Sequence, residues 1–253
     1  SIKKLGKPIT QEITLRDCWG DITKSFGLCL SFVSILIPPT PTDLRLRHNN
    51  KKIKRKRQVE KNMNIFVLNE NPELAARDYC NKHLPKMCVE MLQMLGSAVI
   101  RHGATPEQMP LTKKGTYLKG GYHRHPCSLW VGDSSDNYVW TVRHALEICK
   151  EYTNKYGKIH FCEAGIRHLS NMVKLIPEGN RTHFALAMPD EYRPDYMTAV
   201  SKPFAVITDD EKGIISHARG EEAIQAYRRY YHSKEFAVWD GRKVPHWWMG
   251  DAQ

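Results

Sequence analysis

The sequence predicts an all-α fold: a compact single-domain helical bundle with long loops, preceded by a basic N-terminal appendage. Apolar residues recur at helical spacing, bounded by capping and stop residues, in several segments after residue 70. Charge is concentrated at the front, where residues 1–62 hold 14 Lys and Arg against 5 Asp and Glu, which is +9 of the total net charge of +11. We therefore divide the chain into an appendage at 1–62, expected to be flexible, and a helical domain at 63–253.

The appendage contains the breaking sequence Pro38-Pro-Thr-Pro41 and the basic run from Lys51 to Arg57. This run fits a nuclear address, a phosphate-binding arm, a disordered solubilising tail, or sequence upstream of a natural start at Met63. The apolar run from Phe26 to Ile37 is too short to cross a bilayer as a helix. The seven Cys contain no C-x-x-C pair and favour free thiols in a reducing compartment. We expect an intracellular protein, in the cytoplasm or a host cell, or in the nucleus if the run is an address.

The helical elements follow from caps and periodicity. Asn71 and Pro72 are typical of a helix start, Gly103 and Gly157 of helix ends, and Asp133-Ser-Ser-Asp136 of an N-cap. A short hairpin is expected around 209–213, and the segments 105–121 and 182–193 are expected to be loops. The predicted helices run from Asn71 to about Lys82, from Pro85 to about His102, from the Asp136 cap to Tyr156, from 161 to 176, and from Glu221 to His232. The tail that follows, with Trp239, Trp247 and Trp248, is expected to pack on the body.

One predicted helix carries ionisable residues inside an apolar pattern. Cys88, Met91 and Leu95 form a face that can be buried, while Lys86 and Glu90, four residues apart, are neighbours on a separate stripe. The Glu90 carboxylate therefore has a cation beside it and an apolar wall behind it, which suits a working acid or base. The alternative is an ordinary solvated ion pair on an amphipathic helix.

The turn from Gly120 to Trp130 is dense in chemically active side chains. His123, His125 and Cys127 alternate, but no second cluster completes four zinc ligands, so we expect no metal. Cys127 as a nucleophile needs a base from elsewhere in the fold, which favours a packed thiol.

The same turn also suits nucleic-acid contact. Arg124 fits a phosphate contact, while Tyr122 and Trp130 fit base stacking.

Four segments, in this order, resemble the pyrimidine-dimer DNA glycosylases of the phage endonuclease V type, in their broader bacterial and viral branch. The resemblance covers about residues 63–160, with a weaker likeness in the tail from Tyr227 to Trp248. The segments are the apolar start Met63-Asn-Ile-Phe, the helix Lys82-His-Leu-Pro-Lys-Met-Cys-Val-Glu-Met-Leu-Gln, the turn Gly121-Tyr-His-Arg-His-Pro, and the aromatic helix end Glu151-Tyr-Thr-Asn-Lys-Tyr-Gly-Lys158.

The resemblance implies a compact all-α DNA repair glycosylase with coupled AP lyase activity on pyrimidine-dimer-type damage or modified bases. In the family a free amino-terminal amine attacks the sugar C1′ as the base departs, and a Glu stabilises the developing charge. The resemblance implies that Asn64 holds the position of that nitrogen, that Glu90 is the carboxylate, and that His83 lies in the substrate cleft. It also implies duplex DNA as the partner, no cofactor, no membrane association and a monomer.

The chain departs from the phage enzyme at Val89 and Gln93, which stand where that enzyme has Arg. The DNA contacts are therefore assigned to other residues, namely Lys82, Lys86, Tyr122, Arg124, His125 and Trp130. Two alternative functions remain open. One is a non-catalytic nucleic-acid-binding protein on the same scaffold, with Arg228 and Arg229 also on phosphates, and the other is a nucleotide-modifying enzyme that uses Cys127.

Overall fold

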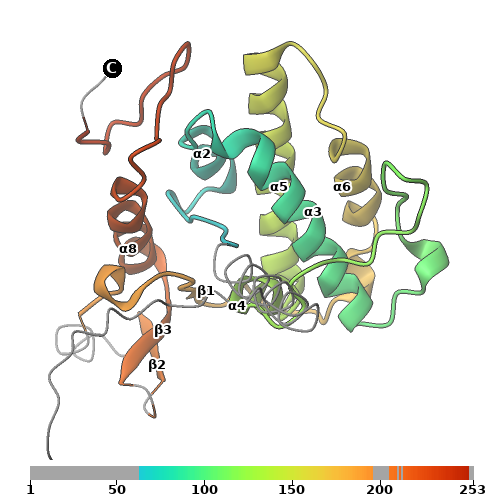
Figure 1. Cartoon of the computed structure of the whole chain (residues 1–253). Helices are drawn as coiled ribbons and strands as arrows, with labels where there is room; N and C mark the ends of the chain where they lie inside the picture. Colours follow the sequence, from blue (N-terminus) through green and yellow to red (C-terminus); the bar gives the residue numbers. More distant parts are fainter. Residues whose placement is uncertain (1–62, 196–204, 210, 212, 251–253) are drawn as a thin grey trace, which may run out of the picture. The chain divides into compact units, whose positions relative to one another are not determined.

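The computed structural model describes residues 63–195, 205–209, 211 and 213–250 (Figure 1). The predicted appendage at 1–62 lies outside these residues and stays a prediction. Within the described ranges the chain forms six α-helices and one three-stranded sheet. The predicted helical character is confirmed, but a purely all-α fold is wrong because of the sheet. In this part of the chain no helix is long and apolar enough to cross a membrane.

Helix α2 (Pro72–Arg77) starts where the sequence predicts, with Asn71 as N-cap and its side chain accepting a hydrogen bond from the Leu74 backbone N–H. It ends five residues before the predicted Lys82. The Trp239 indole N–H donates to the carbonyl of Asp78 at 3.1 Å. The C-terminal tail therefore binds the backbone directly after α2, which helps to separate this helix from the next.

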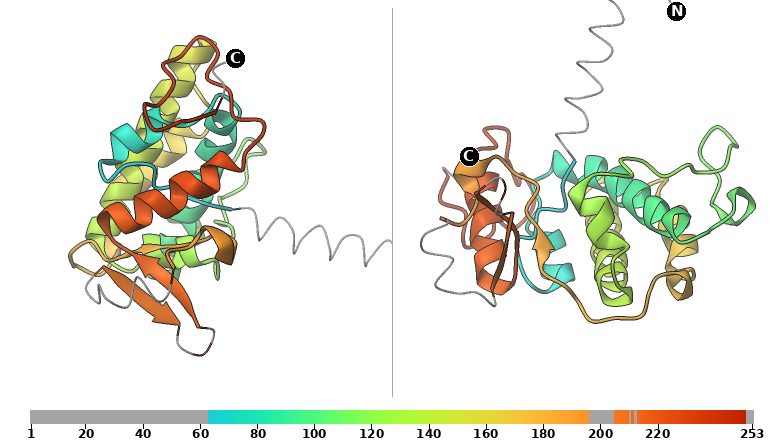
Figure 2. Two further views of the ribbon diagram at one scale, coloured as in Figure 1. Left: turned by 90° about the vertical axis from the view of Figure 1, so that its left-hand side faces the viewer. Right: turned by 90° about the horizontal axis from the view of Figure 1, so that it is seen from below.

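Helices α3 (His83–Arg101) and α5 (Ser135–Tyr156) lie side by side and form the centre of the fold (Figures 1 and 2). Both were predicted within two residues at each end. Ser134 caps α5, and Gly157 ends it in the left-handed conformation at φ +66°. Buried Cys88 and Cys149 meet between the two helices, with their sulfur atoms 3.6 Å apart.

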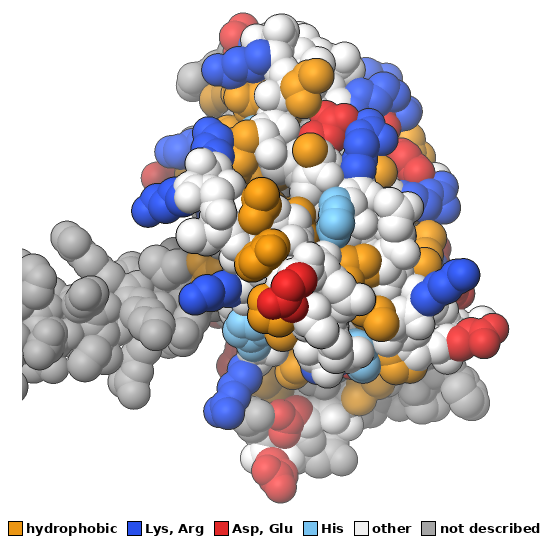
Figure 3. Space-filling view, turned by 90° about the vertical axis from the view of Figure 1, so that its right-hand side faces the viewer, with side chains coloured by type: hydrophobic (Ala, Val, Ile, Leu, Met, Phe, Trp, Pro, Cys, Tyr) orange, Lys and Arg blue, Asp and Glu red, His pale blue; other side chains and the backbone are white. Residues whose placement is uncertain are grey.

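Two shorter helices flank this pair. Helix α4 (Pro126–Val131) was not predicted, because the sequence of this segment reads as a turn. The predicted helix at 161–176 is divided into α6 (Glu163–Ser170) and a 3-10 turn. Figure 3 shows the side of the molecule that carries α6, where apolar side chains are scattered among Lys and Arg. The 3-10 turns of the described chain are η1 (Pro106–Gln108), η2 (Val173–Leu175) and η3 (Asp190–Tyr192).

The sheet has the antiparallel order β1-β3-β2, with β1 at Phe184–Ala185, β2 at Val206–Asp209 and β3 at Ile214–Ala218. The predicted hairpin is confirmed, since it joins β2 to β3. Along these strands Val206 and Ile215 are buried while Ile207 is 46% exposed, the alternation of a half-buried sheet. Strand β1 was missed because two residues are too few to show this periodicity.

Helix α8 (Gly220–His232) confirms the last predicted helix. Its buried Tyr227 and Tyr231 join the core. The tail that follows packs on the body, as predicted: Trp239 is buried, and the Asn81 backbone N–H donates to the carbonyl of Val238 at 2.9 Å. These contacts bring the end of α8 next to the start of α3.

Candidate active site

The predicted Lys86–Glu90 pair forms on the exposed edge of α3. Lys86 Nζ lies 3.0 Å from Glu90 Oε1, and the side chains are 45% and 9% exposed, respectively. One turn of helix separates the two residues, which places their side chains on the same face. The pair is therefore asymmetric, with a solvent-facing cation and a nearly buried carboxylate.

The second carboxylate oxygen of Glu90 faces the backbone of Asn64. The Asn64 backbone N–H donates to Glu90 Oε2 at 3.3 Å. The Asn64 side chain holds this position, because its Nδ2 donates to the carbonyl of Ala187 at 2.5 Å and its Oδ1 accepts from the N–H groups of Ile65 and Phe66. The Phe66 N–H that donates to Asn64 belongs to a residue in the left-handed backbone region, with φ +43°. The nitrogen of residue 64 is therefore fixed against the carboxylate by the fold.

Burial raises the pKa of Glu90, while Lys86 and the Asn64 N–H partly oppose this rise. Removing a carboxylate from water disfavours its charged form, whereas a nearby cation and a donated hydrogen bond favour it. Glu90 therefore takes up a proton at a higher pH than an ordinary Glu. Such opposing influences on one carboxylate are common in active sites.

His83 lies at the start of α3 and is buried, at 3% exposure. Its Nδ1 shares a hydrogen bond with the Tyr231 hydroxyl at 2.7 Å, and its ring stacks on Phe66 at 4.9 Å between centroids. Burial, together with nearby lysines including Lys86, lowers the pKa of His83 to about 3. The imidazole is therefore neutral near pH 7, and its position is linked through Phe66 to the segment that carries Asn64.

The turn predicted to contact DNA docks on α3 beyond Glu90. Ser97 Oγ donates to the carbonyl of Gly121 at 2.7 Å and accepts from its N–H at 2.8 Å. A Cβ on Gly121 would lie 3.2 Å from Gln93, one turn after Glu90. Arg124 is exposed and Tyr122 is half-buried. Ser97 thus holds the loop that carries both residues along the same helix as the Lys86–Glu90 pair.

His125 and Trp130 have structural positions that the sequence did not predict. His125 caps α4, since its Nδ1 accepts from the Cys127 N–H at 3.2 Å. Trp130 is 1% exposed, and its ring packs against Trp140 and Phe184 at centroid distances of 5.9 and 5.0 Å. The helix turns this ring into the core, so the predicted base-stacking role of Trp130 is not compatible with its position.

Cys127 is also unsuited to its alternative role as a nucleophile. It is 1% exposed, and burial raises the pKa of its thiol to about 12. The reactive thiolate is therefore scarce at neutral pH. Within the described ranges, no three His, Cys, Asp or Glu side chains lie close enough together to hold a metal ion.

Three residues near the site were not predicted from the sequence: Tyr230, Lys234 and Phe236. Lys234 Nζ lies 3.5 Å from the centroid of the Tyr230 ring, and Lys82 Nζ lies 4.6 Å from that of Phe236. Tyr230 in turn stacks with Phe66 at 5.7 Å. These residues follow the start of α3 by about 150 positions, so only the docking of α8 brings them there. The cluster Tyr-Tyr-His-Ser-Lys-Glu-Phe at 230–236 was the available signal.

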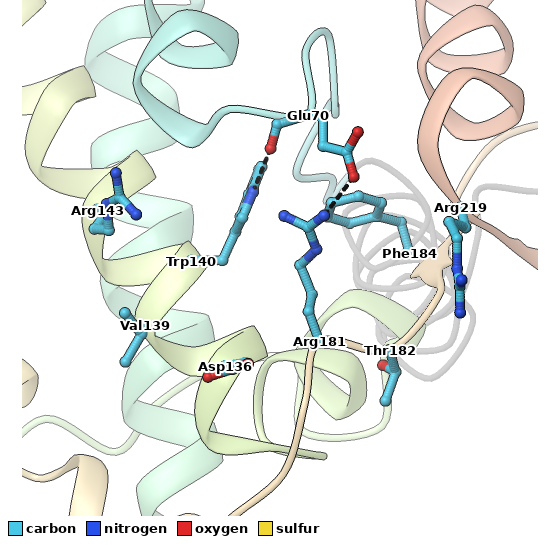
Figure 4. A pocket seen from close by; sticks show the side chains of 9 residues that line it. All are labelled: Glu70, Asp136, Val139, Trp140, Arg143, Arg181, Thr182, Phe184 and Arg219. Carbon is cyan, nitrogen blue, oxygen red and sulfur yellow. Dashed lines mark hydrogen bonds and ion pairs between the residues drawn. The ribbon is translucent and has the colours of Figure 1, made fainter.

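A separate pocket of about 520 Å³ lies among α5, β1 and the segment before α2, and none of the predicted site residues lines it (Figure 4). Arg181 points toward Glu70 and pairs with it at 2.5 Å. Arg143 pairs with Glu73 at 2.8 Å. The guanidinium groups of Arg143 and Arg181, which line the pocket, are thus paired with carboxylates of the protein. The pocket is therefore a weaker candidate for a functional site than the Glu90 site.

The docked turn gives a testable prediction for stability. Gly120 and Gly115 have φ of +66° and +70°, but a Cβ at Gly120 would lie 2.5 Å from Ser97 Oγ, whereas a Cβ at Gly115 meets nothing within 4 Å. We expect Gly115→Ala to lower the free energy of unfolding by about 1 kcal/mol, and Gly120→Ala by about 1–3 kcal/mol more. Urea denaturation measures both. Equal losses would contradict tight docking of the turn on α3.

The site therefore consists of a nearly buried carboxylate, a fixed backbone nitrogen and a flanking cation, on a mostly helical fold. Residues 63–163 match the sequence profile of the family described as pyrimidine dimer DNA glycosylase. This match confirms the family resemblance over that segment, which includes Asn64, Glu90 and the docked turn. Comparison with curated proteins gave no match, and neither did comparison with solved structures. The sheet and α8 lie outside the matched segment.

Proposed function

We propose that this protein is a DNA repair glycosylase with AP lyase activity on pyrimidine-dimer-type damage or modified bases. The observation that carries the proposal is the 3.3 Å contact between the nitrogen of Asn64 and Glu90 Oε2. Loss of a base from deoxyribose develops positive charge at C1′, which a carboxylate at close range stabilises. The family resemblance assigns the catalytic carboxylate to Glu90, and this residue lies within the segment that matches the family.

The nucleophile in this proposal is the nitrogen at position 64. In the 253-residue chain this nitrogen belongs to a peptide bond and cannot attack the sugar. In a chain whose first residue is Asn64, the same atom would be an α-amine, whose ordinary pKa near 8 leaves about a tenth of it neutral at pH 7. The amine would attack C1′ and displace the damaged base, and opening of the sugar ring at O4′ would then give a Schiff base that links Asn64 to the sugar. At a preformed abasic site the amine would instead condense with the sugar aldehyde, and water would leave.

The flanking residues have supporting roles. Lys86 pairs with Glu90 and presents its ammonium to solvent, where a DNA phosphate would contact it. Exposed Lys82 and Arg124 add cations before and beyond it, and Tyr122 offers a half-buried ring. His83, neutral and buried, orders Phe66 and the segment behind Asn64.

Plasmid nicking tests the proposal. Ultraviolet-irradiated and undamaged supercoiled plasmids are incubated with the 253-residue chain and with a chain released from a cleavable fusion so that it starts at Asn64. We expect the shorter chain to nick the irradiated plasmid selectively. Absence of nicking by both chains, on irradiated plasmid and on abasic-site duplexes, would refute the enzyme.

The second candidate is a non-catalytic nucleic-acid-binding protein, favoured by the peptide character of the Asn64 nitrogen in the 253-residue chain. Gel shifts without nicking would support it. Of its predicted phosphate contacts, Arg228 is partly engaged elsewhere, because its Nε donates to the carbonyl of Leu68 at 3.1 Å and its guanidinium lies 5.2 Å from the Trp247 ring centroid. Arg229 donates to the carbonyl of Tyr192 at 3.1 Å.

A further inference from the structure

A surface next to Glu90 combines ammonium groups with aromatic rings, and most of it lies outside the family-matched segment. We call it the lysine–aromatic surface. Its lysines come from the start of α3 and from the segment directly after α8, and its rings come from α8 and the tail. It is made of Lys82, Lys86, Tyr230, Lys234 and Phe236.

Each ring of this surface is covered by an ammonium group. Lys234 Nζ lies 3.5 Å from the Tyr230 centroid, and Lys82 Nζ lies 4.6 Å from the Phe236 centroid. Phe236 is 39% exposed and Tyr230 is half-buried. Cation–π attraction holds each pair together, but only weakly at sites open to water. A ligand that offers a better anionic partner to the lysine would therefore release the ring face.

The charges are crowded on one side. Burial is the main cause that lowers the pKa of Lys234; Tyr192 opposes this shift, and the nearby ammonium of Lys86 adds to it. Of the acidic groups, Glu90 is paired with Lys86. The charge of Glu191 adds to the effect of burial, which raises the pKa of Tyr230. An added phosphate would relieve the repulsion between the lysines.

The surface is continuous with the site. The Phe66 ring lies 5.7 Å from Tyr230 and 4.9 Å from His83, centroid to centroid, and Lys234 Nζ lies 6.0 Å from it. Phe66 follows Asn64 by two residues. Phe66 and His83 are buried, so a strand would lie on the partly exposed Tyr230, next to the segment that places Asn64 against Glu90.

We propose that the lysine–aromatic surface binds an unstacked stretch of single DNA strand beside Glu90, with phosphates on the three lysines and bases on Tyr230 and Phe236. A nucleotide offers both partners that the pairs lack, a phosphate for the ammonium and a flat base for the ring. On binding, each ammonium moves from its ring to a phosphate, and a base replaces it. The proposal rests on the proposed function for the choice of DNA, and it explains how a strand distorted at a lesion is held open.

Fluorescence anisotropy with a labelled 16-nucleotide oligothymidylate, using the full chain, tests this surface. We expect Lys234→Gln and Phe236→Leu each to weaken binding about tenfold, the scale of one lost base–aromatic stack. Lys234→Gln should also reduce the slope of log affinity against log salt by about 0.7, the value for one phosphate contact on a single strand. Phe236→Leu should leave that slope unchanged.

The chain provides a matched control pair. Lys113 Nζ lies 3.9 Å from the centroid of Phe161, which is 50% exposed, so it forms the same kind of contact elsewhere on the surface. Lys113→Gln and Phe161→Leu should leave oligothymidylate binding within twofold of the parent chain. Urea midpoints verify that all four variants are folded.

The outcomes separate this surface from the proposed function. Parent-like binding by Lys234→Gln and Phe236→Leu overturns the surface, as does an equal loss in the control pair or no oligothymidylate binding by the parent chain. Plasmid nicking, measured with chains that start at Asn64 and carry the same substitutions, reports the enzyme independently. If irradiated plasmid is nicked but Lys234→Gln and Phe236→Leu bind oligothymidylate like the parent chain, only the proposed surface is refuted. If these variants lose binding but no nicking occurs, only the proposed enzyme activity is refuted.

Discussion

Replacing Glu90 by Gln is expected to reduce incision of damaged DNA by at least about 100-fold, while DNA binding stays within a few-fold of the parent chain. The substitution is nearly isosteric and removes only the charge and basicity of the carboxylate. Preorganised electrostatic groups at developing charge contribute factors of about 100 to 1,000 to a rate. Single-turnover incision of irradiated duplex, in a chain that starts at Asn64, measures the effect, and gel shifts measure binding.

Glu147→Gln is the matched control. Its carboxylate is also 9% exposed and also paired, with Arg77 at 2.8 Å and Lys150 at 3.5 Å. Both substitutions remove one charge of a nearly buried ion pair, so both are expected to lower stability. Only Glu90→Gln is expected to abolish incision. Retained incision in Glu90→Gln, or an equal loss in Glu147→Gln, would remove Glu90 from the mechanism.

The raised pKa of Glu90 adds a pH signature to this prediction. The carboxylate is charged above its raised pKa and loses its charge as the pH falls through that value. Incision should therefore decline on acidification at a pH above the ordinary range of Glu, near 4.3. Protonation of the α-amine, whose ordinary pKa is near 8, lowers incision on acidification in both chains, so only the additional decline caused by the carboxylate should be missing in Glu90→Gln.

The second large effect concerns the nitrogen at position 64. A chain that starts at Asn64 is expected to form far more borohydride-trapped adduct with abasic-site DNA than the 253-residue chain. Near pH 7 an α-amine has a roughly 200-fold larger neutral fraction than an ordinary Lys, and only the neutral amine attacks. Initial trapping rates on denaturing gels measure the difference.

A chain with a single Gly before Asn64 is the control for this experiment. It keeps a free α-amine but moves it one residue away from Glu90, and the nitrogen of Asn64 becomes a peptide nitrogen again. We expect its trapping rate to fall toward that of the 253-residue chain. Equal trapping in all three chains would assign the nucleophile to a lysine, with Lys82 and Lys86 as the first candidates.

The parts of the fold that the sequence predicted are those with local causes. Helices α3 and α5 were found because their caps and apolar periods lie within the segments themselves. Helix α4 was missed because the residues before Pro126 read as a turn, and six residues are too few to show a period. Strand β1 depends on pairing with β3, more than 30 residues later, which no local pattern reports.

The same distinction applies to the site. The Lys86–Glu90 pair spans four residues, so helical spacing predicted it. The contact between Asn64 and Glu90 spans 26 residues, and only the family resemblance pointed to it. Lys234 reaches the site through the docking of α8, which the sequence did not reveal. The prediction for Trp130 failed because exposure was inferred from a turn that is a helix, and the helix buries the ring.

Mass-spectrometric mapping of the borohydride-reduced adduct most directly tests the central claim, that Glu90 and the nitrogen of residue 64 act on the same sugar. The chain starting at Asn64 is trapped on abasic duplex, digested with nuclease and protease, and searched for the sugar remnant. We expect the remnant on the α-nitrogen of Asn64, with a much lower yield in Glu90→Gln because the carboxylate assists Schiff-base formation. A remnant on the side chain of Lys82, Lys86 or another lysine, with the Asn64 peptide unmodified, would contradict it.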